Sequence, residues 1–180
     1  MRSPTENSQE LLLPIQPEDH VQGAPDAKYT FVEYGDYECP KCGILFQAIC
    51  QLRAAQGDRL RLVFRHYPFS GIHPHAQQSA EAAEAAGAQG RFWEMHDLLF
   101  ANQSALETRD LYRYADHLSL DMHRFRDELK HRVYEQYVRE DFRRGVANGV
   151  YGTPGLFING VRHNGALDHD SLLAQLEPTT

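Results

Sequence analysis

Two cysteines in the first quarter of the chain, Cys39 and Cys42, have the spacing of a thiol–disulfide redox pair. At the first turn of a helix, residues three apart lie on one face, close enough to form a disulfide with little change of the backbone. The free N–H groups and the positive end of the helix dipole would stabilise a thiolate there. We therefore predict that Cys39 is an exposed nucleophile with a lowered pKa, and that the deeper Cys42 resolves the mixed disulfide.

The residues beside the two cysteines also affect this site. Pro40 suits the first helical position, where its missing N–H costs no hydrogen bond. Lys41 adds a positive charge near the sulfur, whereas Glu38 adds a negative charge that acts in the opposite direction. The sequence thus predicts the direction of the Cys39 pKa shift but not its size.

Two other uses of a CxxC pair fit the sequence less well. A zinc site needs four ligands, and with no second CxxC the others would have to come from Cys50, His73 and His75. A purely structural disulfide that closes so short a loop would remove little entropy from the unfolded chain. His73 and His75 stand at the entrance of the following region and could face the cysteines, and the residues leave this open.

The segments around the cysteines predict a strand, a helix and a second strand. β-branched and aromatic residues indicate a strand over residues 29–34, and the helix extends from residue 41 to about residue 56, before Gly57. Alternating apolar residues indicate the second strand at residues 60–67. The result is a right-handed parallel βαβ unit with the cysteines at the carboxyl end of its first strand.

Glu33 is a charged residue inside the first predicted strand, and the residues leave two interpretations open. Its side chain points to solvent if one face of the strand is exposed. If a sheet covered on both faces buries it, Glu33 lies near Cys42 with a raised pKa and relays a proton.

The middle of the chain is predicted to be entirely helical. Apolar residues at helical spacing between residues 74 and 148 indicate about four helices, the last of them a long one capped by Asp121 and buried from Phe125 to Phe142. We interpret the aromatic residues and histidines of this region as core and surface residues rather than ligands. Cys50 is too far along its helix from Cys42 to form a disulfide, and we predict a buried thiol there.

The C-terminal part carries a hairpin signal. Asn159 and Gly160 stand between apolar residues, the pattern of a two-residue turn that joins antiparallel strands. Gly152-Thr153-Pro154 precedes this hairpin, and an amphipathic helix follows it and ends before Pro178.

The composition is that of a soluble globular protein. The chain has 180 residues, 24% of them charged and 42% hydrophobic, which suits one domain with a large insertion. The net charge of −7 argues against nucleic acid and anionic membranes as partners. No apolar run approaches the ~20 residues of a membrane span, and no signal-peptide pattern occurs near the start. We therefore predict a cytoplasmic protein with no membrane partner and with a mobile tail over residues 1–22.

The order of these elements resembles that of the DsbA-like branch of the thioredoxin superfamily from about residue 19 to the C-terminus. The residues that carry the resemblance are Cys39-Pro40-Lys41-Cys42, Glu33 six residues earlier, and Gly152-Thr153-Pro154 before the hairpin. It implies an α/β thioredoxin fold in which residues 23–73 and 150–180 form the thioredoxin-like domain. Residues 74–149 would then be an all-helical insertion between its βαβ half and its C-terminal ββα half.

The resemblance also implies roles for individual residues. Cys39, Cys42 and Glu33 would be catalytic, with Glu33 as the buried proton relay. Substrate would be bound by four residues: Pro40, Lys41, Thr153 and Pro154. The peptide bond before Pro154 would be cis, and the Thr153 backbone would pair with an extended substrate peptide. Lys41 stands where the periplasmic oxidants of this family have histidine.

The sequence thus supports the hypothesis of a thiol–disulfide oxidoreductase that acts on proteins or small thiols. We expect an enzyme of this kind to need no cofactor or metal, with glutathione as an alternative reductant or substrate. One alternative is a kappa-type glutathione transferase or isomerase, a class that usually lacks the paired cysteines. The other is a redox-sensing module without turnover.

Overall fold

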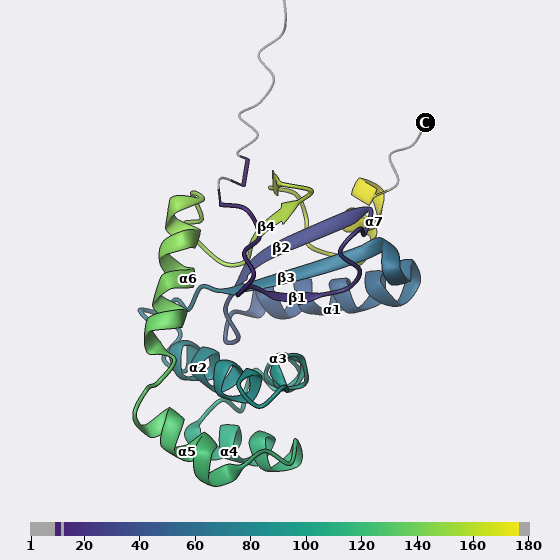
Figure 1. Ribbon diagram of the computed structural model, residues 1–180. Helices are drawn as coiled ribbons and strands as arrows, with labels where there is room; N and C mark the ends of the chain where they lie inside the picture. The colour runs from purple at the N-terminus through teal and green to yellow at the C-terminus, as the bar shows by residue number, and fades with distance from the viewer. Residues whose placement is uncertain (1–9, 12, 177–180) are drawn as a thin grey trace, which may run out of the picture.

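The computed structural model describes residues 10, 11 and 13–176, and it consists of one mixed β-sheet and a helical half (Figure 1). In chain order the elements are β1 (His20–Gln22), β2 (Tyr29–Gly35), α1 (Pro40–Gln56), the short 3₁₀ helix η1 (Gly57–Arg59), β3 (Leu60–His66), α2 (Ala76–Gly87), α3 (Phe92–Ala101), α4 (Thr108–His117), α5 (Met122–Lys130), α6 (Glu135–Ala147), β4 (Gly155–Ile158), β5 (Val161–His163) and α7 (His169–Leu176).

The sheet has the strand order β1-β3-β2-β4-β5. Only β2 and β3 are parallel, and α1 connects them, so the predicted βαβ unit is confirmed. The predicted hairpin is confirmed as well, because β4 and β5 pair antiparallel around Asn159 and Gly160. These two residues have φ angles of 48° and 82°, the positive values that a two-residue hairpin turn requires.

Helices cover both faces of the sheet. α1 and α7 pack on one face, where Phe31 and Leu62 of the strands contact Leu45 and Leu172 of the helices. On the other face, Val32 and its neighbours pack against α6 and against residues that precede β1. Because both faces are covered, six of the seven residues of β2 are buried, which leaves no solvent-facing side for Glu33.

The helical half comprises α2 to α5 and lies beyond one end of the sheet, with α6 leading back toward it (Figure 1). Five helices occur where about four were predicted. The long helix predicted after Asp121 is wrong, because the chain turns between α5 and α6 and Arg132 there has a φ of 53°. The core of this half also includes Cys39 and Cys42, so both cysteines lie where the two halves meet.

The prediction of a mobile tail over residues 1–22 is wrong for most of the part that the structure describes. β1 pairs antiparallel with β3, and Leu11 and Ile15 pack against the sheet. Asp19 accepts two hydrogen bonds from the fully buried guanidinium of Arg65, at 2.9 and 2.7 Å. The buried ion pair and the strand pairing hold this segment on the sheet. Residues 1–9 and 12 lie outside the described residues.

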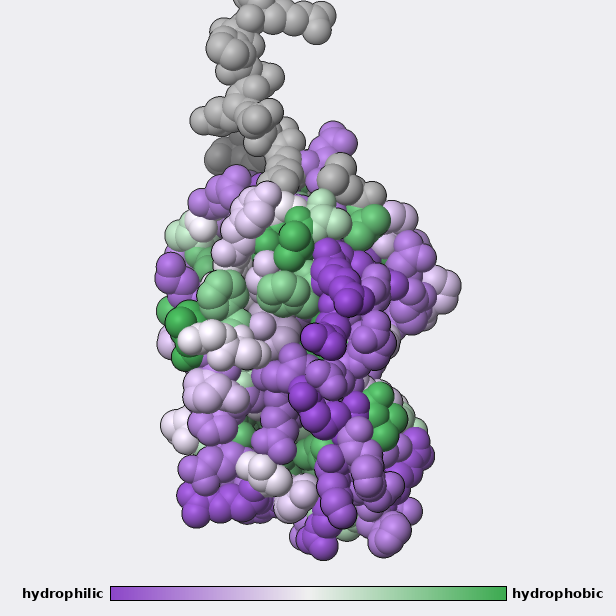
Figure 2. Space-filling model, turned by 90° about the vertical axis from the view of Figure 1, so that its left-hand side faces the viewer, coloured by the Kyte–Doolittle hydropathy of each residue, from purple (hydrophilic) through white to green (hydrophobic). Residues whose placement is uncertain are grey.

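Figure 2 shows the side of the molecule on which α1 begins. On the face that this view shows, apolar side chains are scattered mainly over the sheet half, and the helical half is largely hydrophilic. Among the residues that the structure describes, no helix combines the length and the apolar character of a membrane span.

Candidate active site

Cys39 directly precedes helix α1, and hydrogen bonds hold the loop that leads to it. It is the N-cap residue, directly before Pro40 at the first helical position. The helical half contributes to this arrangement through Gln103, whose side-chain amide donates to the carbonyl oxygens of Tyr37 and Cys39 at 2.9 and 2.8 Å. The two cysteines therefore lie at the start of a helix, as predicted, and Gln103, for which the sequence carries no signal, holds the preceding loop.

The surroundings of Cys39 favour its thiolate. A hydrogen bond from the Cys42 thiol is the largest cause that lowers the Cys39 pKa, to about 5 from 9.0; partial burial opposes it and the Thr153 side chain supports it. No regular capping hydrogen bond reaches the Cys39 side chain, yet the N–H groups of Cys42 and Lys41 lie close enough to lower the pKa further. In the thiol form, Cys39 donates to the Thr153 carbonyl at 3.5 Å.

The three cysteines differ in burial from what the sequence suggested. Cys39 was predicted to be exposed, but only 6% of it is accessible, because the loop before β4 and the helical half pack around it. Cys42 is fully buried, and this burial raises its pKa well above 9.0. Cys50 was predicted to be buried and is exposed on α1. All three are thiols in this structure.

Glu33 lies in the interior, as the second interpretation of its position required. Only 1% of it is exposed, and its Oε1 atom is buried without a hydrogen-bond partner among the described residues. Burial, assisted by the charge of Cys39, raises the Glu33 pKa to about 8. The carboxylate in turn contributes to the raised pKa of Cys42, so the two groups are electrostatically coupled. A buried neutral carboxyl group that is electrostatically coupled to a thiol has the chemistry of a proton donor.

We expect Glu33→Gln to remove a pH dependence from the stability of the disulfide form. Folded Glu33 keeps its proton up to about pH 8, whereas the unfolded residue loses it near pH 4.5. The folded state therefore binds more protons than the unfolded state in this window, and its free energy of unfolding falls as the pH rises from 4.5 to 8. Urea titrations of the disulfide form, in which no Cys39 thiolate contributes, should show a steeper fall in the wild type than in Glu33→Gln. The variant keeps the smaller fall that comes from Asp141, whose pKa burial raises to about 6.

The slope against pH, not the absolute stability, is the measurement in this comparison. Glu140→Gln, which changes an exposed carboxylate on α6, is the matched control and should keep the fall. An equal slope in Glu33→Gln and the wild type would show that Glu33 is not the group that holds the proton.

The charged residues around the pair are arranged differently from the prediction. Lys41 is exposed, and its ammonium group is not among the main causes of the low Cys39 pKa. Glu38 turns away to His75, with which it makes contacts of 2.8 Å to the ring and 2.7 Å to the backbone N–H. Glu38 thus connects the loop before α1 to the segment before α2 through these two contacts. The helix start and the Cys42 thiol lower the Cys39 pKa instead.

An apolar groove of about 420 Å³ opens beside Cys39. Its walls are the start of α1, the loop after β3 and the loop before β4, and its lining residues are Cys39, Pro40, Lys41, Phe69, Ile72, His73, Gly152 and Thr153. The peptide bond between Thr153 and Pro154 is cis, which confirms that prediction. Three of the predicted substrate-binding residues, Pro40, Lys41 and Thr153, line this groove, and Pro154 follows directly.

His73, which the sequence offered as a residue that could face the cysteines, lines the groove beside Cys39. Its Nδ1 atom lies 2.8 Å from Oδ2 of Asp36, a side chain that is fully buried. The two Asp36 oxygens also accept the backbone N–H groups of Glu38 and Phe69, each at 2.8 Å. No signal in the sequence indicates the contact between His73 and Asp36, because the two residues lie 37 positions apart in the chain.

The family model described as Thioredoxin matches residues 16–178. Two similar proteins are named Na(+)/H(+) antiporter NhaA 1. The one from Salinispora arenicola is 46% identical over 92% of this chain and 25% of its own length, and the one from Mycolicibacterium gilvum is 46% identical over 93% and 28%. The chain thus spans about a quarter of the length of these relatives.

Two solved structures share the fold. The first is a thioredoxin-like oxidoreductase from Silicibacter pomeroyi, with a TM-score of 0.77, 24% identity, and coverage of 89% of this chain and 91% of the other. The second is α-DsbA1 from Wolbachia pipientis, with a TM-score of 0.77, 19% identity, and coverage of 94% of both chains. At such identities the likeness concerns the fold, and it confirms the predicted thioredoxin fold with a helical insertion.

The relatives overturn the predicted location. An antiporter exchanges ions across a membrane, and proteins 46% identical to this chain over most of its length bear that name. The prediction of a cytoplasmic protein is therefore wrong, and the prediction of no membrane partner has no support. The net charge of −7 and the polar first residues describe this module, but they carry no information about the longer proteins in which such a module occurs.

Proposed function

The chain belongs to the thioredoxin family, and from that membership we propose that it is a DsbA-like thiol–disulfide oxidoreductase that works through Cys39 and Cys42. The observation that carries the proposal is the contrast between the two sulfurs. The Cys39 pKa is lowered to about 5 at the edge of an apolar groove, and the Cys42 pKa is raised in the interior. The activity is proposed for this module alone.

The proposed reaction begins from the Cys39–Cys42 disulfide. A substrate thiolate attacks Sγ of Cys39, the bond between the two cysteines breaks, and Cys42 leaves and takes a proton from Glu33. A second substrate thiolate then attacks the substrate sulfur of the mixed disulfide, and Cys39 leaves as a thiolate. Two electrons pass from the substrate dithiol to the protein, and the substrate becomes a disulfide. The reverse sequence reduces a substrate disulfide.

The low Cys39 pKa supports the oxidising direction. A stabilised thiolate is a good leaving group, and it stabilises the reduced protein relative to the disulfide form. The groove supports a protein substrate, because Phe69 and Ile72 expose apolar surface beside the sulfur, with 68% of Ile72 accessible. An extended peptide that passes Cys39 could bury these side chains.

We expect the dithiol pair to equilibrate with glutathione at an oxidising potential, above about −180 mV. The measurement is the fraction of reduced Cys39 and Cys42 across a series of glutathione buffers at pH 7, read by alkylation and mass spectrometry. Cys50→Ser is the suitable background, because it removes the exposed third thiol. A potential near about −270 mV, in the range of reducing thioredoxins, would contradict the oxidising direction.

A further inference from the structure

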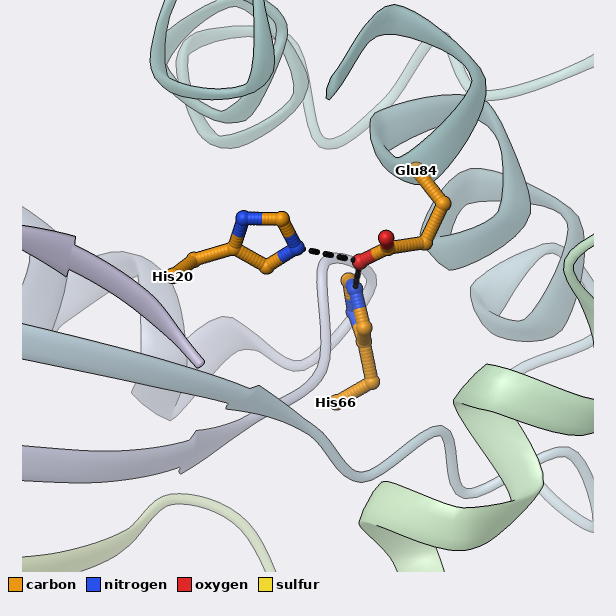
Figure 3. Close-up of side chains that lie close together, drawn as sticks. All are labelled: His20, His66 and Glu84. Carbon is orange, nitrogen blue, oxygen red and sulfur yellow. Dashed lines mark hydrogen bonds and ion pairs between the residues drawn. The ribbon is translucent and has the colours of Figure 1, made fainter. Parts of the chain in front are cut away.

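A cluster of three side chains lies between the sheet and the helical half, apart from the cysteines. Figure 3 shows His20 from β1, His66 from the end of β3 and Glu84 from α2 pointing toward one another. The Nε2 atoms of both rings lie 2.7 Å from the same carboxylate oxygen, Oε1 of Glu84. The possible ligand atoms of the three side chains all lie within 4.8 Å of one another. Three segments distant in sequence thus direct two nitrogens and an oxygen at one point.

We propose that His20, His66 and Glu84 bind one divalent transition-metal ion of the Zn²⁺ class. Two imidazole nitrogens and one carboxylate oxygen are donors that Zn²⁺ and Co²⁺ take in proteins, whereas Mg²⁺ and Ca²⁺ prefer oxygen alone. Ligand atoms of a tetrahedral zinc centre are roughly 3.3 Å apart, from bond lengths of about 2.0–2.1 Å. The nitrogen–oxygen separations of 2.7 Å would have to open by about 0.6 Å to reach that value.

The chemistry of the cluster allows a cation to replace protons. Each ring shares a proton with the same Glu84 oxygen, and a divalent ion at that point would displace both protons. One carboxylate and two neutral imidazoles would then leave the bound ion with a single net positive charge. The Glu84 side chain is 8% exposed, so the site is largely shielded from water.

The imidazole rings of His20 and His66 differ in packing and in exposure to solvent, and both can face an ion. His20 stacks on Phe92 with the ring planes 4° apart, which fixes the plane of its imidazole. The Nδ1 atom of the buried His66 has no hydrogen-bond partner among the residues described, so its ring can turn toward an ion without breaking another hydrogen bond. The His20 side chain is 18% exposed, compared with 1% for His66. An ion would enter from the His20 side, where water can supply the fourth ligand.

Zinc titration of a variant without cysteines tests this site independently of the proposed redox function. Cys39, Cys42 and Cys50 are replaced by serine in the full chain, so that no thiolate competes for the metal. Calorimetry with ZnCl₂ should show one saturable site per chain, and Zn²⁺ should raise the thermal midpoint. Co²⁺ should give a d–d absorption band.

Two ligand variants and a control complete the experiment. His20→Asn and Glu84→Gln should each weaken Zn²⁺ binding by at least about tenfold. His117→Asn, which changes an exposed histidine at the end of α4, should leave it unchanged. If Glu84→Gln fails to fold, the partly exposed His20 still provides the comparison. No saturable binding, or equal affinity in parent and His20→Asn, would overturn the proposal and leave the cluster as a hydrogen-bonded trio.

Discussion

Replacing Cys39 by serine should abolish disulfide exchange, by at least about a thousandfold, whereas replacing Cys42 by serine should leave a protein that captures substrate and cannot release it. Cys39 lines the groove and carries the lowered pKa, so it is the sulfur that a substrate meets. Cys42 is fully buried and reaches no substrate itself, but the internal disulfide cannot form without it.

The two variants give different signatures in a pair of assays. Oxidative refolding of a reduced substrate protein measures turnover. Incubation with the disulfide form of the same substrate protein, followed by acid quenching and mass spectrometry, detects the mixed disulfide. We expect no turnover from either variant, and a covalent adduct from Cys42→Ser when it meets a substrate disulfide. Cys50→Ser should keep full turnover because this thiol is exposed elsewhere on α1. Substantial turnover by Cys39→Ser would contradict the mechanism.

Alkylation of Cys39 should follow a titration with a midpoint at about pH 5. At pH 6 a thiol of pKa 5 is about 90% ionised, and one of pKa 9 about 0.1%, a difference of roughly 900-fold. The lower intrinsic reactivity of the more acidic thiolate offsets about 60-fold of this, so Cys39 should react roughly tenfold faster than an ordinary thiol. The midpoint is therefore a more decisive measurement than the rate.

Cys50 is an internal control for this titration, because it lies on the same helix and partial burial raises its pKa. Peptide mapping after a short pulse of iodoacetamide distinguishes the two residues. Cys42→Ala should shift the Cys39 midpoint upward, since the hydrogen bond from Cys42 is the largest cause of the low pKa. A midpoint near pH 9 in the wild type would show that Cys39 has an ordinary thiol pKa and would remove the basis of the proposed direction.

Some features of the fold follow from short stretches of sequence. The strand over residues 29–34, the helix that begins beside Cys39, and the hairpin turn at Asn159-Gly160 each depend on neighbours within a few residues. Hydrophobic periodicity, helix capping and turn preferences all act between residues that are close in the chain. The bounds of these elements were therefore predicted to within one or two residues. The break between α5 and α6 was missed because the apolar pattern continues across it, while the backbone at Arg132 takes a positive φ.

Other features required knowledge of what packs against each residue. The side chain of Glu33 could be assigned to the interior only once helices were known to cover both faces of the sheet. The exposures of Cys39 and Cys50 were both predicted wrongly, because position on a helix does not say which loops cover it. The prediction of the cellular location was wrong for a different reason. The location depends on the longer proteins in which such modules occur.

The sequence by itself determined that Cys39 and Cys42 lie close together, because two cysteines at the start of one helix are neighbours in any fold that contains that helix. Only the tertiary structure decided that His20, His66 and Glu84 converge, and that His73 shares a groove with Cys39. Contacts within one helical turn follow from backbone geometry. Contacts between segments tens of residues apart depend on the path of the whole chain and on the packing of its two halves.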